Sequence, residues 1–249
     1  MEGVENTLFW YKPLLGVAEL SGLAVVALMG VWMGHFRNGF AWQENPSLEF
    51  NWHPLLTTIG LIFLLGNNIL VYRTFRGGRK NTLKLIHAGI HIGSFVFTVV
   101  ALKAAFDSHD LKTPPIPNMY SLHSWMGIIT VLLFVMEWIA GFIMFLLPSL
   151  GLDKCAKLNL FVARYKTHYM SVHITFGILI FVLASATALL GVTEKMIFGG
   201  KYSEMNPEGV LVNAMGILLI EFGFVVVYLA TKHQYKRVPI EMVGSVHQN

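Results

Sequence analysis

Hydrophobic residues along the chain fall into six long runs that are separated by short polar links. The runs cover roughly 13–35, 53–74, 84–106, 121–147, 170–192 and 209–231. About 20 apolar residues suffice for an α-helix to cross a bilayer. The pattern therefore predicts an all-α membrane protein with six transmembrane helices, which form a single domain over residues 1–249. The fifth helix could begin earlier, near Tyr165.

The overall composition agrees with a chain embedded in a lipid bilayer. Of the 249 residues, 55% are hydrophobic and only 13% are charged, whereas soluble domains carry about 25% charged residues. The net charge of +4 is confined to the links and forms no basic face with interleaved aromatic residues, so we expect no nucleic-acid partner. A lone cysteine, Cys155, excludes an internal disulfide. The N-terminus shows no evident cleavable signal peptide.

Basic charges gather in alternate links of the chain. The link 73–84 holds five basic residues and no acid, the link 148–169 has a basic excess, and the C-terminal tail adds three more basic residues. The remaining links are mixed or acidic. Under the positive-inside rule, the basic links and both termini are expected to face the cytoplasm.

Four histidines lie near the N-terminal edges of four consecutive runs: His53 in FNWHP, His87 in LKLIHAG, His123 in YSLHSW and His173 in SVHITFG. Ionisable side chains at such depths are costly and mark function. Consecutive helices alternate in direction, so His53 and His123 should share the lumenal or exterior side, and His87 and His173 the cytoplasmic side. Two imidazoles on facing helices suit a six-coordinate haem iron, which carries electrons. The pattern predicts two bis-histidine haems in a four-helix core made by the second to fifth helices.

Several polar residues leave other interpretations open. His91 lies four residues after His87 on the same helix face, so it could be the ligand or a hydrogen-bonding neighbour of the site. Zinc fits less well, because it prefers four ligands in one place. A non-redox transporter or proton channel that uses the histidines and intramembrane acids is the alternative from another class. We expect those acids to be isolated, neutral, hydrogen-bonded groups; they are Glu19, Glu137 and Glu221.

At these histidines the sequence resembles the cytochrome b561 family, whose members are ascorbate-dependent transmembrane electron carriers. The resemblance covers nearly the whole chain and rests on FNWHP, NILVYRTFR, KLIHAG, MYSLHSW and the PEGV segment before the last helix. The segments VYRTFR and GGKYSEMNPEGVLVN most resemble the chromaffin-granule, or secretory-vesicle, branch. The resemblance implies two haems b, ligated by His53 with His123 and by His87 with His173, and it favours His87 over His91.

The resemblance also implies a cytoplasmic ascorbate site beside the basic residues Arg73, Lys80 and Lys84. Ascorbate is a monoanion at pH 7, so basic side chains attract and orient it. One departure concerns the fifth helix, where ARYKTHYMSVH lacks the proline of the relatives. Lys166 has the matching spacing in that segment, although Arg164 could take its place.

On the lumenal side, the segment that leads into the fourth helix resembles the electron-acceptor region of the family. The residues concerned are His109, Asn118 and Tyr120, with Phe106 nearby. The family function would be electron transfer from cytoplasmic ascorbate to lumenal monodehydroascorbate, which regenerates vesicular ascorbate.

The nearest alternative function is a transmembrane ferric reductase that delivers the same electrons to a ferric chelate. A third is a haem-binding subunit of a larger complex. The resemblance further implies a homodimer in a secretory-vesicle or other endomembrane.

Overall fold

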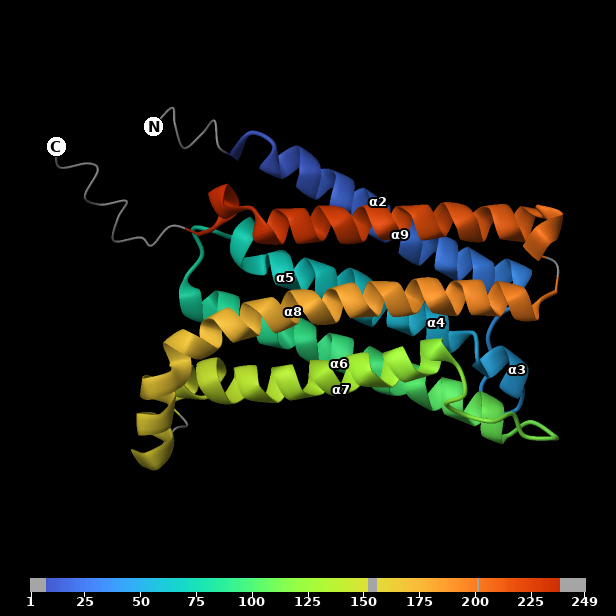
Figure 1. Cartoon of the computed structure of the whole chain (residues 1–249), viewed down its shortest axis with the longest axis horizontal. Coiled ribbons are helices and arrows are strands. Elements are labelled where there is room, and N and C mark those ends of the chain that lie inside the picture. Colours follow the sequence, from blue (N-terminus) through green and yellow to red (C-terminus); the bar gives the residue numbers. More distant parts are fainter. Residues whose placement is uncertain (1–7, 152–155, 201, 238–249) are drawn as a thin grey trace.

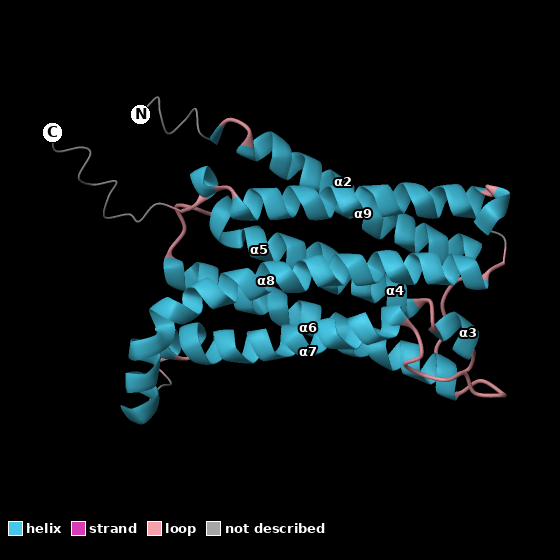
Figure 2. Cartoon of the chain, viewed as in Figure 1, coloured by secondary structure: helices cyan, strands magenta, loops and turns pink. Residues whose placement is uncertain are grey.

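The computed structural model describes residues 8–151, 156–200 and 202–237, with side chains omitted for 156–158. Cys155 and the first seven residues therefore lie outside the described residues. All regular structure in these ranges is helical (Figure 2). Six helices among the described residues are long and apolar enough to cross a membrane: Tyr11–Phe36, Pro46–Thr74, Lys80–Asp110, Leu122–Leu146, Asn159–Phe198 and Pro207–Thr231. The prediction of an all-α protein with six transmembrane helices is confirmed, and the protein is a multi-pass membrane protein.

Three spans contain a π-helical segment. The first span joins α2 (Tyr11–Val31) to η1 (Trp32–Phe36). The elements that follow are α3 (Pro46–Glu49), α4 (Trp52–Thr57), the π-helix η2 (Thr58–Leu64), α5 (Leu65–Thr74), α6 (Lys80–Asp110), α7 (Leu122–Gly141), the π-helix η3 (Phe142–Leu146), η4 (Pro148–Leu150), α8 (Ala156–Phe198), η5 (Tyr202–Glu204), α9 (Pro207–Thr231) and η6 (His233–Tyr235). Such π segments often occur at functional sites. Here η2 starts five residues after His53, and η3 directly follows the helix that carries His123.

Local sequence signals explain where two of the spans begin. Ser121 accepts a hydrogen bond from the Ser124 amide and completes a capping box at the start of α7. Asn206 accepts a hydrogen bond of 2.7 Å from the Gly209 amide at the start of α9, where Pro207 occupies the first position. Both caps lie within the motifs MYSLHSW and NPEGV.

Helix α8 is longer than the fifth hydrophobic run. It begins at Ala156 rather than near 170 or Tyr165, because the segment before His173 contains no proline or glycine that would end it. The charged residues of this segment lower its hydropathy without breaking the helix. Arg164 and Lys166 therefore lie on a helix, and Figure 1 shows the first turns of α8 (yellow) at an angle to the rest of it.

The helices form one bundle with two distinct ends (Figure 1). We name the end that contains Thr74, Lys80 and Thr231 the basic end, and the end that contains Phe36, α3 and Pro207 the α3 end. Helix α2 packs mainly against α9 on one side of the bundle, whereas α4 packs against α6 and α7 against α8. The large side chains of Leu65, Phe181 and Phe222 are buried together in the core of the bundle.

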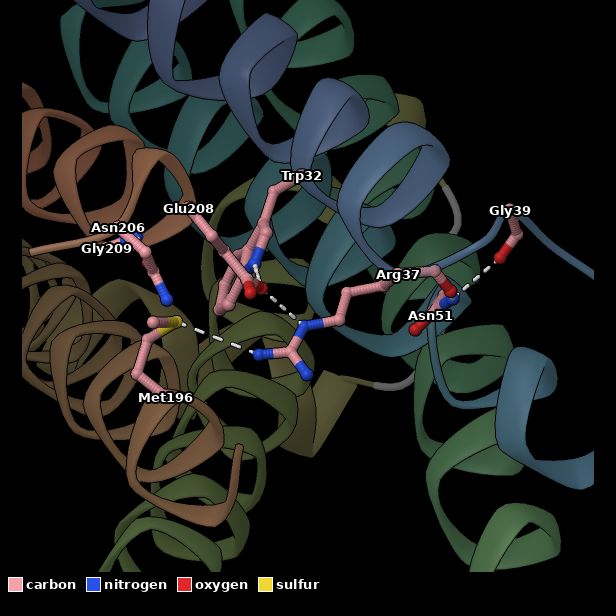
Figure 3. Close-up of polar contacts among 8 residues, drawn as sticks. All are labelled: Trp32, Arg37, Gly39, Asn51, Met196, Asn206, Glu208 and Gly209. Carbon is pink, nitrogen blue, oxygen red and sulfur yellow. Dashed lines mark hydrogen bonds and ion pairs between the residues drawn. The ribbon is translucent and has the colours of Figure 1, made fainter. Parts of the chain in front are cut away.

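A polar network ties the elements of the α3 end together (Figure 3). Glu208 at the start of α9 forms an ion pair with Arg37, 2.6 Å between Nε and Oε1, and accepts a hydrogen bond from the Trp32 indole. The Asn51 side chain donates to the carbonyls of Arg37 and Gly39. The network therefore fixes the link after the first span against α9 and the start of α4, two residues before His53.

Candidate functional site

His53 and His123 face each other at the α3 end. Their ring centroids are 6.0 Å apart and the ring planes are nearly perpendicular, at 84°. The Nδ1 atom of His53 donates to the Ala101 carbonyl (3.1 Å), and that of His123 donates to the Thr187 carbonyl (2.9 Å). A carbonyl can only accept, so the proton sits on Nδ1 and each Nε2 keeps a free lone pair.

His87 and His173 form the corresponding pair at the basic end. Their centroids are 6.2 Å apart at an interplanar angle of 70°. The His87 Nδ1 donates to the Asn68 carbonyl (3.1 Å), and the buried Asn68 side chain donates back to the His87 carbonyl (3.0 Å). The His173 Nδ1 contacts the carboxylate of Glu137 instead of a carbonyl.

The four Nδ1 contacts link neighbouring spans in both directions. His53 of the second span bonds to a residue on α6, and His87 on α6 bonds to a residue of the second span. In the same way, His123 on α7 bonds to α8, and His173 on α8 bonds to α7. Each histidine is thus oriented by the helix next to its own.

Two glycines allow neighbouring helices to lie close to the histidine rings. A Cβ atom on Gly191 would lie 2.6 Å from Cε1 of His123, which is a clash. A Cβ atom on Gly141 would lie 3.1 Å from Cε1 of His173, a tight contact. Gly191 follows Thr187 by one helical turn, and Gly141 follows Glu137 by one turn, so each glycine shares a helix face with the hydrogen-bond acceptor.

His91 does not face a second histidine across the bundle as His87 does. Its ring lies 4.6 Å from the His87 ring and 5.5 Å from that of Phe134. Its buried Nδ1 has no hydrogen-bond partner among the described residues. The structure therefore places His91 as a neighbour of the His87 ring.

A cavity of about 680 Å³ opens beside His53 and His123 at the α3 end. The predicted acceptor-site residues line the same cavity; they are Phe106, His109, Asn118 and Tyr120. His109 donates from Nδ1 to the Asn118 side chain (3.0 Å), which in turn donates to Asp110 (2.7 Å). Burial raises the pKa of the Tyr120 phenol, and the Glu194 carboxylate raises it further, so Tyr120 remains a neutral hydrogen-bond donor.

Two lysines that the sequence pattern did not mark as site residues also line the cavity, Lys112 and Lys195. Lys112 lies in the link before α7, and Lys195 lies four residues after Gly191 on α8. The Lys195 amine is 4.0 Å from the centroid of the Phe50 ring, a cation–π contact. A signal was available, because TEKMIF follows directly on the fifth hydrophobic run, but one lysine at a helix end resembles an ordinary topogenic charge.

At the basic end, Lys84 lies beside the second histidine pair. Its amine donates to the Phe145 carbonyl (3.2 Å) and to Ser149, and the Phe145 ring lies 5.2 Å from the His173 ring. Lys80 and Lys166 are close enough to Lys84 for their charges to repel it. Three of the four residues predicted to bind ascorbate therefore lie together.

The fourth predicted residue, Arg73, makes a different contact. Its guanidinium donates to the Lys232 carbonyl (2.7 Å) at the end of α9, where helix carbonyls lack partners. Arg164, the alternative to Lys166, places its guanidinium over the ring of Tyr165. Neither of these contacts involves Lys80, Lys84 or Lys166.

Comparison with known proteins identifies the family. Residues 52–199 match the profile of eukaryotic cytochrome b561. The human "Transmembrane ascorbate-dependent reductase CYB561" is 45% identical over 222 residues, which cover 88% of this chain and 82% of the relative. The Xenopus tropicalis "Plasma membrane ascorbate-dependent reductase CYBRD1" is 42% identical over 243 residues, or 95% of this chain and 79% of the relative. The chain belongs to the cytochrome b561 family.

Membership in the cytochrome b561 family implies a haem b cofactor, and the histidine pairs fit this group. Metal–imidazole bonds are about 2 Å long, so two rings that share one metal have centres roughly 6 Å apart, as both pairs do. The free Nε2 atoms and the oriented Nδ1 atoms are the arrangement expected of metal-ligating histidines. The cavity at His53 and His123 is also within the size range of cofactor sites.

Proposed function

We propose that this protein carries electrons across a membrane from ascorbate at the basic end to an acceptor at the α3 end, through two haems b. The observation that carries the proposal is the pair of facing histidines at each end of one bundle in a chain of the cytochrome b561 family. His53 with His123 and His87 with His173 would be the axial ligands. Each histidine pair would hold a haem that supplies a reversible one-electron couple.

The lysines of the basic end would bind the electron donor. Ascorbate is a monoanion, and the adjacent charges of Lys80, Lys84 and Lys166 attract it and hold it beside the His87–His173 pair. Arg73, which donates to the Lys232 carbonyl, would contribute by fixing the end of α9 and by adding positive charge. The names of the human and Xenopus relatives as ascorbate-dependent reductases support this donor.

The cavity of the α3 end would bind the electron acceptor. His109, Asn118 and Tyr120 offer hydrogen-bonding groups, and Lys112 and Lys195 add positive charge for an anion. We propose monodehydroascorbate as that acceptor, in line with the secretory-vesicle branch. A ferric chelate is the second candidate, because the same cavity and charges would receive it.

The distribution of charge supports an orientation with the basic end in the cytoplasm. The basic links and the segment after α9 lie together there, since Arg76 donates to the Lys236 carbonyl and Arg237 donates to the Gly78 carbonyl. We further propose that the chain is one domain with cytoplasmic tails, that it forms a homodimer, and that it resides in a secretory-vesicle or other endomembrane.

The proposal is tested by spectroscopy and haem counting in purified protein. We expect two haems b per wild-type chain, with mainly one lost in His87→Ala and mainly the other lost in His123→Ala. A wild type that stays colourless after reconstitution with haem would overturn the proposal and favour a non-redox transporter. A haem-loaded protein that ascorbate cannot reduce without a partner would favour a subunit of a larger complex.

A second assay separates the two acceptors. Proteoliposomes loaded with ascorbate on the basic side are supplied on the other side with monodehydroascorbate or with a ferric chelate at matched driving force. Faster turnover of monodehydroascorbate supports the vesicular function. Faster turnover of the ferric chelate would assign the protein as a ferric reductase.

A further inference from the structure

The four proposed haem ligands differ in what holds their Nδ1 atoms. His53, His87 and His123 donate to backbone carbonyls of the neighbouring helix at 2.9 to 3.1 Å. His173 instead contacts the side-chain carboxylate of Glu137. Glu137 therefore occupies the place that a backbone carbonyl of the neighbouring helix takes in the other three cases.

The surroundings of Glu137 hold its carboxylate in this contact. Glu137, Gly141 and Phe145 are spaced four residues apart along one span, and all three lie beside the His173 ring. Gly141 allows close approach, and the Phe145 ring packs 5.2 Å from the imidazole. The hydroxyl of Tyr169, on α8, donates to the second carboxylate oxygen at 3.1 Å. The side chain of Glu137 is only 15% exposed.

We propose that Glu137 is a positioning residue that lowers the reduction potential of the haem at the His87–His173 site by accepting the Nδ1 proton of His173 in a hydrogen bond. Tyr169 weakens this effect by donating to the same carboxylate. The inference rests on the proposed function, because it takes the His87–His173 pair as the ligands of one haem.

The physical basis is the strength of the hydrogen bond to the ligand. A carboxylate is a stronger acceptor than a neutral carbonyl, and a stronger acceptor on the outer nitrogen makes an imidazole a more basic ligand. A more electron-rich ligand stabilises the ferric state over the ferrous state, so the potential falls. A hydroxyl that shares the carboxylate's negative charge reduces its pull on the imidazole proton, so removing Tyr169 should act in the opposite direction from removing Glu137.

The test is a redox titration of the holoprotein in detergent at one fixed pH. Glu137→Gln keeps the shape and loses the carboxylate, and we expect the potential of one haem to rise by at least a tenfold change in its reduction equilibrium, about 59 mV for a one-electron couple. Tyr169→Phe should lower the potential of the same haem. The other haem should not move in either variant. Glu221→Gln, which removes an intramembrane acid from α9, serves as the matched control and should leave both potentials unchanged.

A spectroscopic measurement shows that the effect acts through the ligand. The low-spin ferric electron paramagnetic resonance signal of one haem should change in Glu137→Gln and Tyr169→Phe, because its g values report the ligand field of the axial imidazole. Shifts of the same sign in both variants, or equal shifts of both haems, would overturn the inference and indicate a general structural change. If Glu137→Gln loses the haem, the sign of the Tyr169→Phe shift decides.

Failure of this inference can be told apart from failure of the proposed function. A wild type with two haems and unchanged potentials in Glu137→Gln would refute the role of Glu137 and leave the electron path intact. A wild type that binds fewer than two haems would refute the two-site path itself, before any variant is measured.

Discussion

The two ends of the bundle carry the same pair of facing histidines but differ in what surrounds them. At the α3 end, a cavity of about 680 Å³ reaches from His53 and His123 to the surface residues His109 and Tyr120. At the basic end, Lys84 donates to Ser149 and to the carbonyl of Phe145, whose ring packs against His173. The same histidine pairs are thus combined with different surroundings, so the two ends differ in which molecule can reach them.

The two ends also differ in what supports a histidine ring. On the His123 side, the contacts come from a backbone carbonyl and a glycine of α8. On the His173 side, a carboxylate of α7 takes the place of the carbonyl. A substitution does not remove a backbone acceptor but does remove a side-chain acceptor, so the acceptor can be exchanged at His173 and not at His123.

The largest expected effect concerns Gly191 and Gly141, the two glycines beside the histidine rings. In Gly191→Ala the new Cβ would lie 2.6 Å from Cε1 of His123, so the ring must move and we expect loss of most of the α3-end haem. In Gly141→Ala the corresponding distance to His173 is 3.1 Å, and we expect both haems to be retained. Haem per chain, measured from the reduced spectrum, checks both variants. Equal losses in the two would show that the glycines do not control ring placement.

The next effect concerns the donor at the basic end. Lys84→Gln removes a positive charge beside the proposed ascorbate site, and we expect the KM for ascorbate to rise about tenfold, since a charged hydrogen bond contributes about 1.5–3 kcal/mol. The difference from wild type should shrink at high salt. Lys12→Gln, which removes an exposed lysine of α2 at the same end, is the control and should leave the KM unchanged. Unchanged ascorbate kinetics in Lys84→Gln would remove that residue from the donor site.

A smaller effect is expected for the acceptor at the α3 end. Lys195→Gln should raise the KM for an anionic acceptor roughly threefold, as is typical of a partly solvated charge pair, and should not affect a neutral ferric chelate. Lys103→Gln is the matched control at this end, because that lysine is exposed and paired with Asp107. If the anionic and neutral acceptors respond alike, Lys195 has no role in recognising charge.

The smallest effect concerns the pH dependence at Tyr120. An ordinary tyrosine ionises near about pH 10, but burial and Glu194 raise the pKa of this phenol. The neutral form is therefore kept as pH rises, and turnover with monodehydroascorbate should show no tyrosine ionisation between about pH 8 and about pH 10. Tyr120→Phe should reduce the rate about twofold without changing the shape of the pH profile. A step in the wild-type profile that Tyr120→Phe abolishes would contradict this assignment.

Much of the fold could be predicted from the sequence, because the bilayer imposes long apolar runs that are easy to count. The start of α8 at Ala156 could not, since a helix that continues beyond the apolar run leaves no mark in hydropathy. The π-helical segments η1, η2 and η3 also escaped prediction, because a change of hydrogen-bond register does not alter which residues are apolar.

The candidate site could be predicted as far as topology determines it. Alternating helix directions bring His53 to His123 and His87 to His173, and the structure has both pairs within 6.2 Å. The contact of Glu137 with His173 spans 36 positions, and the contact of Arg73 with the Lys232 carbonyl spans 159. Such contacts depend on the rotation of each helix about its axis, which a pattern of hydrophobic positions determines only coarsely.

The reciprocal histidine bonds have a mechanical consequence. Two helices joined near one end alone can slide or swivel, but the second span and α6 are joined near both ends, and so are α7 and α8. Any axial slip of one helix would strain both of its bonds at once. Each helix pair therefore resists sliding as one rigid unit, and the distance between the two histidine pairs is set by the length of helix between the bonds.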